Sequence, residues 1–105
     1  AITGTNGKTS TKNLIYDVLN EKFKVMKTIG NFNNHIGLPL SILSINKTYD
    51  CAVLEFGASK IGDITELCEI GKPNYGLITN LNPSPCMFNI STLGSNFRYF
   101  RSLAM

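Results

Sequence analysis

Thr3-Gly4-Thr5-Asn6-Gly7-Lys8-Thr9-Ser10 joins the end of a short apolar segment to a helical pattern, and it determines how the rest of the chain is interpreted. Glycines let a loop curl until several backbone N–H groups face one centre. The N-terminus of the following helix adds unpaired donors and the positive end of its dipole. A lysine and a hydroxyl at that point suit phosphate oxygens and Mg²⁺ respectively. The octapeptide therefore predicts a phosphate-binding loop at residues 4–10.

The spacing departs from the strict pattern G-x-x-x-x-G-K-[ST], because Ile2 stands where that pattern has its first glycine. The shorter pattern G-x-x-G-K-[ST] is less specific by itself. It also describes a glycine turn before a helix whose lysine has no function. The preceding strand and the following helix favour the phosphate loop.

Strand and helix signals alternate from this loop as far as residue 80. Three helices are expected, at residues 8–23, 36–45 and 63–70. Four short strands are expected, at residues 1–3, 24–28, 50–56 and 75–79. Leu14, Ile15, Val18 and Leu19 form the apolar face of the first helix, and Pro39 fits only the first turn of the second. Such alternation indicates βαβ units, so we expect an α/β fold with a P-loop type parallel sheet flanked by helices.

The composition is that of a globular domain, with 43% apolar and 16% charged residues. No apolar run reaches the roughly 18 residues of a membrane span. The net charge of +3 and scattered lysines do not suggest a nucleic-acid interface. Cys51, Cys68 and Cys86 lack metal-ligand spacing, so we expect free thiols in the reducing cytoplasm. The chain begins with Ala1 in a strand signal, which we interpret as a start within a longer protein.

Polar side chains follow two of the expected strands. Glu55 ends the strand at 50–56, and Asn80 follows the strand at 75–79. Ligands of open parallel sheets bind at the carboxyl ends of the strands, where the phosphate loop also lies. We therefore expect Glu55 and Thr9 to hold Mg²⁺ and Asn80 to contact the ligand. The alternative for Glu55 is a solvated carboxylate at a strand end.

A loop rich in asparagine precedes the second helix. Asn33 and Asn34 are candidate binding residues, although Asn also tolerates turn backbone. His35 is the only histidine, and it could equally cap the next helix, so we do not assign it as a general base.

Several motifs in order resemble the Mur ligase family. They are the phosphate loop, Gly30-Asn31-Phe32-Asn33-Asn34-His35-Ile36-Gly37-Leu38-Pro39, Leu54-Glu55-Phe56-Gly57-Ala58, Gly62-Asp63-Ile64 before Lys72-Pro73, and Ile78-Thr79-Asn80. The resemblance identifies residues 1–81 as part of the family's central ATP-binding domain and leaves 82–105 as a divergent tail. The phosphate loop alone would also fit folylpolyglutamate synthase, against which the Asn-rich loop argues.

The resemblance implies an ATP- and Mg²⁺-dependent amide ligase of peptidoglycan synthesis. ATP phosphorylates the terminal carboxylate of UDP-N-acetylmuramoyl-tripeptide, and the amine of D-alanyl-D-alanine attacks the acyl phosphate to give an amide and phosphate. The implied catalytic residue is Lys8, and the implied metal ligands are Thr9 and Glu55. The implied nucleotide- or substrate-binding residues are Gly4, Thr5, Asn6, Gly7, Lys8, Thr9, Ser10, Asn33, Asn34 and Asn80.

The family pattern stops after Asn80. The family continues there with Ala-His-Leu-Glu, whose histidine binds a second Mg²⁺, and further on with a carbamylated lysine. Here Leu81-Asn82-Pro83-Ser84-Pro85 follows, with no later histidine or lysine. A shifted reading frame through Ser84-Pro85-Cys86 can restore Ala-His, so the tail is either a frameshift or a genuine divergence.

The family's N- and C-terminal domains also lie outside this chain. Since ligation assembles its site across domains, we expect no ligation by the chain alone. The alternatives left open are a folylpolyglutamate synthase-like ligase, a nucleotide-binding module without catalysis and a fragment that does not fold stably.

Overall fold

A parallel β-sheet forms the centre of the molecule. The computed structural model describes residues 1–30, 32–60 and 62–80, and the backbone of residues 99–102. The strands in this part of the chain are β1 (Ile2–Thr3), β2 (Val25–Lys27), β3 (Cys51–Val53), β4 (Tyr75–Ile78) and β5 (Tyr99–Ser102). β2 pairs with β3, and β4 pairs with both β1 and β5, always in parallel.

The two sets of strands are joined through Ile2. Its N–H donates to the Leu54 carbonyl at 2.8 Å, and its carbonyl accepts from the Phe56 N–H at 2.8 Å. A parallel bridge between Ile2 and Glu55 lies at the same point. The spatial order is therefore β2-β3-β1-β4-β5, with the first strand of the chain in the middle.

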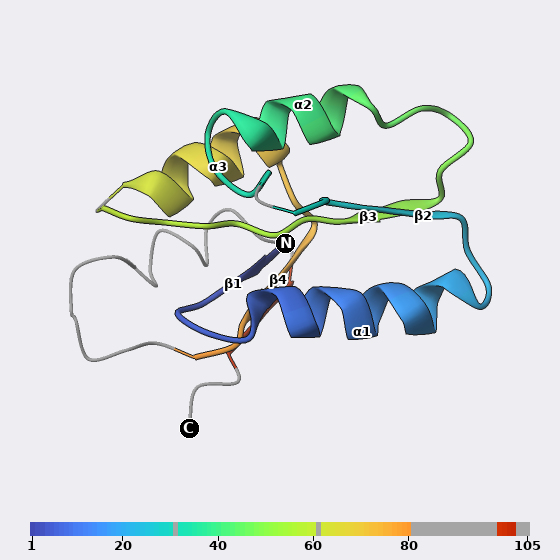
Figure 1. Ribbon diagram of the computed structural model, residues 1–105, viewed down its shortest axis with the longest axis horizontal. Coiled ribbons are helices and arrows are strands. Elements are labelled where there is room, and N and C mark those ends of the chain that lie inside the picture. Colours follow the sequence, from blue (N-terminus) through green and yellow to red (C-terminus); the bar gives the residue numbers. More distant parts are fainter. Residues whose placement is uncertain (31, 61, 81–98, 103–105) are drawn as a thin grey trace.

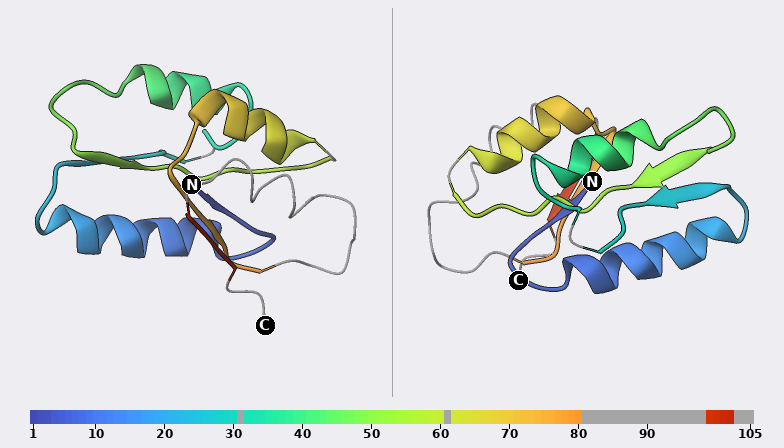
Figure 2. Two further views of the ribbon diagram at one scale, coloured as in Figure 1. Left: turned by 180° about the vertical axis from the view of Figure 1, so that it is seen from behind. Right: turned by 45° about the horizontal axis from the view of Figure 1, so that its top comes forward.

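Helices cover both faces of the sheet (Figures 1 and 2). α1 (Lys8–Asn20) lies on one face, while α2 (Gly37–Leu43) and α3 (Asp63–Gly71) lie together on the other. Pro39 stands in the first turn of α2, as its missing N–H requires. α3 ends where Lys72 adopts a positive φ of 44° and donates its N–H to the Cys68 carbonyl at 2.8 Å.

The larger core lies between the sheet and the pair α2 and α3. Its buried members are Met26, Leu38, Leu54, Phe56, Ile64, Leu67, Cys68 and Ile78. Leu38 and Phe56 are fully buried, and burying one such side chain contributes about 1.5–3 kcal/mol. This packing fixes α2 and α3, and with them the loops that precede each helix.

The core under α1 is smaller. Ile15 and Leu19 pack against buried Ile2, Val25 and Val53. Leu14 and Val18, which the sequence analysis placed on the same apolar face, are instead 65% and 66% exposed. The helix therefore contacts the sheet along only part of its expected apolar face.

The expected α/β fold is confirmed. The expected helices and strands are present up to residue 80, with ends that differ by a few residues. β5 is a strand that the sequence analysis did not assign. The expectation of a divergent tail otherwise concerns residues outside the described ranges. No described helix is long and apolar enough to cross a membrane.

Candidate nucleotide-binding site

The loop between β1 and α1 has the backbone of an anion-binding turn. Gly4 and Gly7 adopt positive φ angles of 139° and 83°, which L side chains rarely take. A Cβ on Gly4 would collide with the Thr79 Oγ1 and would lie 3.0 Å from the Asn80 carbonyl oxygen. Position 4 must therefore be a glycine, because of its positive φ and because the residues after β4 pass close to its Cα.

Residues after β4 hold this loop in place. The Thr5 N–H donates to the Asn80 carbonyl at 3.0 Å, and the Asn6 N–H donates to the Asn80 Oδ1 at 2.9 Å. The Thr79 hydroxyl donates to the Asn6 carbonyl at 2.5 Å. The structure therefore shows that Asn80 shapes this loop, and its expected contact with the ligand stays a prediction.

The N-terminus of α1 is electrostatically suited to an anion. The first four N–H groups of an α-helix have no partner within the helix, and the dipole is positive there. α1 has no acidic residue in its first turn to neutralise this end. The Lys8 Nζ turns back over the loop and donates to the carbonyls of Gly4 at 2.9 Å and Thr5 at 3.4 Å.

A pocket of about 310 Å³ opens over these groups. Its lining residues are Thr5, Asn6, Gly7, Lys8, Thr9, Ser10, Gly30, Asn33 and Glu55. Most of the site residues expected from the sequence therefore meet in one pocket. Gly4, Asn34 and Asn80 do not line it, but Gly4 and Asn80 shape the loop that does.

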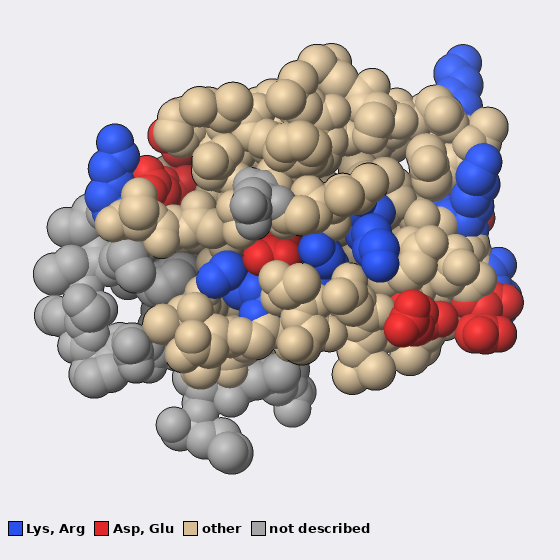
Figure 3. All heavy atoms as spheres, viewed as in Figure 1, with Lys and Arg blue, Asp and Glu red and all other residues tan. Residues whose placement is uncertain are grey.

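Glu55 is the acidic group of this pocket. Its side chain is nearly buried, and residues from two separate segments, α1 and the loop before α2, contact its carboxylate. The Thr9 hydroxyl donates to its two oxygens at 3.2 and 3.1 Å, and the Asn33 Nδ2 donates to Oε1 at 3.1 Å. The Lys12 Nζ lies 3.2 Å from Oε2. Figure 3 shows acidic atoms between basic side chains in the middle of the molecule, between α1 and the layer formed by α2 and α3.

Lys12 was not among the site residues expected from the sequence. Thr9 and Lys12 stand three residues apart, and residues at that spacing share a face of a helix. Once Thr9 was expected beside Glu55, the same spacing placed Lys12 toward the same carboxylate. The apolar residues of α1 attracted attention instead, although Lys12 is the buried residue of that helix.

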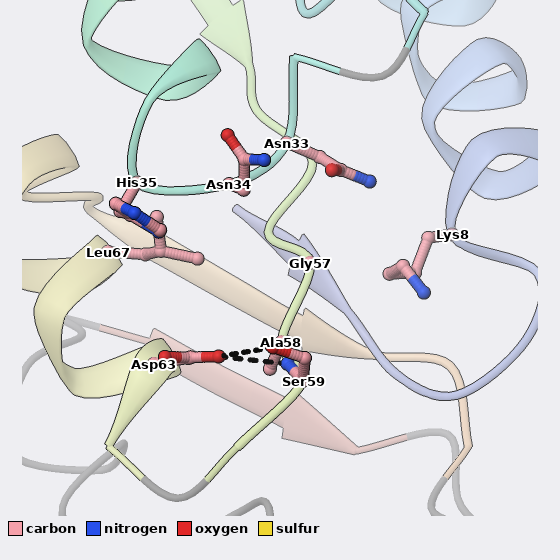
Figure 4. Close-up of a pocket in the computed structure, with 9 residues that line it drawn as sticks. All are labelled: Lys8, Asn33, Asn34, His35, Gly57, Ala58, Ser59, Asp63 and Leu67. Atoms are coloured by element: carbon pink, nitrogen blue, oxygen red, sulfur yellow. Dashed lines mark hydrogen bonds between the residues drawn. The ribbon is translucent and has the colours of Figure 1, made fainter.

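A second pocket of about 370 Å³ adjoins the first (Figure 4). Its lining residues are Lys8, Asn33, Asn34, His35, Gly57, Ala58, Ser59, Asp63 and Leu67. Lys8 and Asn33 line both pockets, so they stand at the boundary between them. A ligand in the second pocket would therefore face the lysine of the phosphate loop.

Two polar residues build the walls of this second pocket. The Asn34 Oδ1 accepts from the N–H groups of Ile36 at 3.1 Å and Gly37 at 2.8 Å, so Asn34, not His35, caps α2. The Asp63 Oδ2 accepts from the N–H groups of Ser59 at 2.9 Å and Lys60 at 3.0 Å. The hydrogen bond from the Ser59 N–H is the largest cause that lowers the pKa of Asp63 below its usual value of 3.8.

The described cysteines are free, as expected. Cys68 is buried, and burial raises the pKa of its thiol to about 11. Cys51 is half-buried, and its pKa is raised as well, chiefly by desolvation. Both thiols are therefore protonated at neutral pH. Cys86 lies outside the described residues.

The oxygen atoms at Glu55 and Thr9 suit Mg²⁺ as ligands. A nearly buried carboxylate and a hydroxyl converge there, and both are hard oxygen ligands. Among the described residues, no three His, Cys, Asp or Glu side chains gather in one place. A Mg²⁺ ion at this point would therefore complete its shell with phosphate oxygens and water, as this ion commonly does.

Known proteins resemble this chain over most of its length. The Mur ligase middle domain family matches residues 2–84. The UDP-N-acetylmuramoyl-tripeptide–D-alanyl-D-alanine ligase of Bacillus subtilis (strain 168) is 48% identical over 83 residues, which is 79% of this chain and 18% of that protein. The enzyme of the same name from Escherichia coli (strain K12) is 38% identical over 81 residues, covering 77% of this chain and 18% of that protein.

Solved structures agree with these relatives. The UDP-N-acetylmuramoylalanyl-D-glutamyl-2,6-diaminopimelate–D-alanyl-D-alanyl ligase of Acinetobacter baumannii matches with a TM-score of 0.73 at 35% identity, over 75% of this chain and 18% of that one. The MurF ligase of Thermotoga maritima in complex with ADP matches with a TM-score of 0.63 at 44% identity, over 75% of this chain and 19% of that one. The chain thus spans under a fifth of the length of these relatives.

Proposed function

This chain belongs to the Mur ligase family, and from that premise we propose that it is the nucleotide-binding part of a ligase that joins D-alanyl-D-alanine to UDP-N-acetylmuramoyl-tripeptide. The observation that carries the proposal is the contact between Thr9 at the start of α1 and Glu55, which follows β3. It brings a phosphate loop and a metal-binding carboxylate to one pocket. The relatives of that name and the ADP complex of the Thermotoga maritima enzyme support the choice of substrates.

In this proposal ATP phosphates lie over the N-terminus of α1. The amides of residues 7–10 donate to the phosphate oxygens, and Lys8 exchanges the carbonyls of Gly4 and Thr5 for the β- and γ-phosphates. Thr9 and Glu55 would hold Mg²⁺, which would neutralise phosphate charge when bound. Lys8 then stabilises the charge that develops on the transferred phosphoryl group.

The second pocket suits the carboxylate that receives the phosphoryl group. It shares Lys8 and Asn33 with the nucleotide pocket, so a carboxylate there would lie beside the γ-phosphate. The N-terminal and C-terminal domains of such a ligase supply the remaining contacts to both substrates. The chain alone is therefore expected to bind ATP in the cytoplasm without forming the amide.

The first test is the affinity of the chain for ATP, measured by calorimetry with Mg²⁺ present. Lys8→Ala removes a charge-assisted contact of about 1.5–3 kcal/mol, so the affinity should fall about 10- to 150-fold. Lys47→Ala is the matched control, because Lys47 is an exposed lysine that does not line the pocket. Equal affinities of the wild-type chain and Lys8→Ala would refute a working phosphate loop.

The second test asks which reaction this part serves. Residues 1–81 replace the matching segment of the Bacillus subtilis ligase, to which the chain is 48% identical. The chimera is expected to form the amide from UDP-N-acetylmuramoyl-tripeptide, D-alanyl-D-alanine and ATP, and the Lys8→Ala chimera is not. A folded chimera that binds ATP but forms no amide would favour a nucleotide-binding module without catalysis.

A further inference from the structure

Lys12 is a buried lysine that has one ion-pair partner, Glu55, among the described residues. The side chains of Lys12 and Glu55 are 3% and 4% exposed, and the Nζ lies 3.2 Å from Oε2. Transfer of two charges from water into such a place costs several kcal/mol each, which only a close and well-bonded pair can offset. The phosphate-loop chemistry described above uses Lys8, Thr9 and Glu55, but it leaves this lysine without a role.

The contacts around Glu55 show what Lys12 supplies. Thr9 and Asn33 donate neutral hydrogen bonds to the carboxylate, and the Glu55 N–H is held by the Thr28 Oγ1 at 3.1 Å. Lys8 does not serve as the counter-charge, since its Nζ is bonded to two loop carbonyls. Among the described residues, Lys12 is therefore the full positive charge paired with this carboxylate.

We propose that Lys12 is a positioning residue, which holds the Glu55 carboxylate in place as a counter-charge before Mg²⁺ binds and then competes with the ion for that carboxylate. The inference rests on the proposed Mg²⁺ site at Thr9 and Glu55. It goes further because Lys12, a residue outside that site, is given two opposite effects on it. The benefit is a preformed carboxylate, and the cost is a weaker hold on the metal.

The cost follows from elementary electrostatics. A Mg²⁺ ion bound to Glu55 and the Lys12 ammonium would be like charges that share one anion, and the side chains of Lys12 and Glu55 are shielded from water. Their repulsion lowers the affinity for the ion relative to a site without the lysine. Without Mg²⁺ the effect is reversed, because a buried carboxylate that loses the ammonium paired with it destabilises the fold.

Lys12→Met tests both consequences, since methionine keeps much of the length of the side chain and removes the charge. Thermal unfolding is followed at fixed protein concentration, first in EDTA and then with rising Mg²⁺ and a non-hydrolysable ATP analogue. We expect a lower Tm than wild type in EDTA and a gap that narrows as Mg²⁺ rises, because the ion takes over the role of the lysine. Mn²⁺ binding, measured by electron paramagnetic resonance, should become at least about tenfold tighter in Lys12→Met.

Two variants separate charge from packing. Lys12→Arg keeps the charge and should retain the wild-type response to Mg²⁺. Lys12→Gln removes the charge but keeps a donor, so it should respond like Lys12→Met with a smaller loss of Tm in EDTA. If Lys12→Met is unfolded in EDTA, recovery of its unfolding transition on addition of Mg²⁺ supports the inference, and no recovery overturns it.

The remaining outcomes distinguish the two proposals. An equal loss of Tm in Lys12→Met at every Mg²⁺ concentration, or weaker Mn²⁺ binding, would overturn the role of Lys12 while leaving the nucleotide site intact. If the wild-type chain with the ATP analogue shows no response to Mg²⁺ or Mn²⁺, the metal site at Glu55 is wrong, and the inference fails with it.

Discussion

Gly4→Ala is the substitution for which the structure gives the clearest magnitude. The φ of 139° at Gly4 is strained for any residue with a Cβ, at a cost of about 1–3 kcal/mol. The added methyl group would also meet the Thr79 hydroxyl and the Asn80 backbone, with the carbonyl oxygen at 3.0 Å and the nitrogen at 3.1 Å. A side chain can rotate away, but the Asn80 backbone is held by the bond from the Thr5 N–H to its carbonyl, and the Asn80 side chain is bonded to the Asn6 N–H as well.

The two effects add to a loss of about 3 kcal/mol or more in the free energy of unfolding. For a domain of this size each kcal/mol corresponds to roughly 4–8 °C in Tm, so the transition should fall by about 12 °C or more. Gly30→Ala is the matched control, since Gly30 has a positive φ of 56° and no atom within 4 Å of an added Cβ. It should lose only about 1–2 kcal/mol, the cost of a left-handed backbone.

The assay is urea unfolding of both variants and the wild-type chain, followed by far-ultraviolet circular dichroism. The slope of the transition should be the same in all three, so that the midpoints report stability. Equal losses in Gly4→Ala and Gly30→Ala would refute the close approach of the loop to the end of β4. Gly4→Ala should also weaken ATP binding, because the loop must move to admit the methyl group.

Two further predictions concern the loops that line the second pocket. Asn34→Ala should lower the free energy of unfolding in urea by about 0.5–2 kcal/mol, because it removes the acceptor of the Gly37 N–H. Asn34→Asp keeps that acceptor and should leave the free energy of unfolding nearly unchanged. Equal losses in the two variants would contradict the capping role of Asn34. Asp63→Asn should be less stable than wild type at pH values above 3.8, the usual pKa of an aspartate. This difference in stability should disappear as the pH falls through the lower pKa that Asp63 has in the folded chain, because protonation removes the charged acceptor of the Ser59 and Lys60 N–H groups. Unfolding at several pH values from 7 to 3 measures the difference, and a difference that stays constant would contradict the prediction.

The sequence predicted the positions that local chemistry dictates. Glycines followed by Lys8 and Thr9 mark a loop that opens a helix, and the structure has that loop. Glu55 was expected at the ligand edge because it ends an apolar strand, and it lies there beside Thr9. Both predictions depend on order along the chain, which the sequence displays directly.

Features that depend on tertiary partners could not be predicted in this way. Leu14 and Val18 fit the apolar face of α1, but the sheet beneath the helix reaches only Ile15 and Leu19. β5 was not assigned because its parallel pairing with β4 has no local signature in the preceding sequence, which is rich in Asn, Ser and Pro. The bonds by which Asn80 holds the loop of residues 4–10 depend on where that loop lies, which is known only once the sheet is assembled.

The central place of β1 has a consequence for how the chain is made. The contacts of its residues reach far along the sequence, from Thr3 to Phe56 and from Thr3 to Thr79. A ribosome adds about 5–20 residues per second, so the first residues wait roughly 4–15 s until β4 exists. Throughout that time β1 lacks a partner on at least one edge, and both of its edges are paired only after β4 has left the ribosome. Folding during synthesis should therefore begin between β2 and β3, with the phosphate loop among the last parts to take shape.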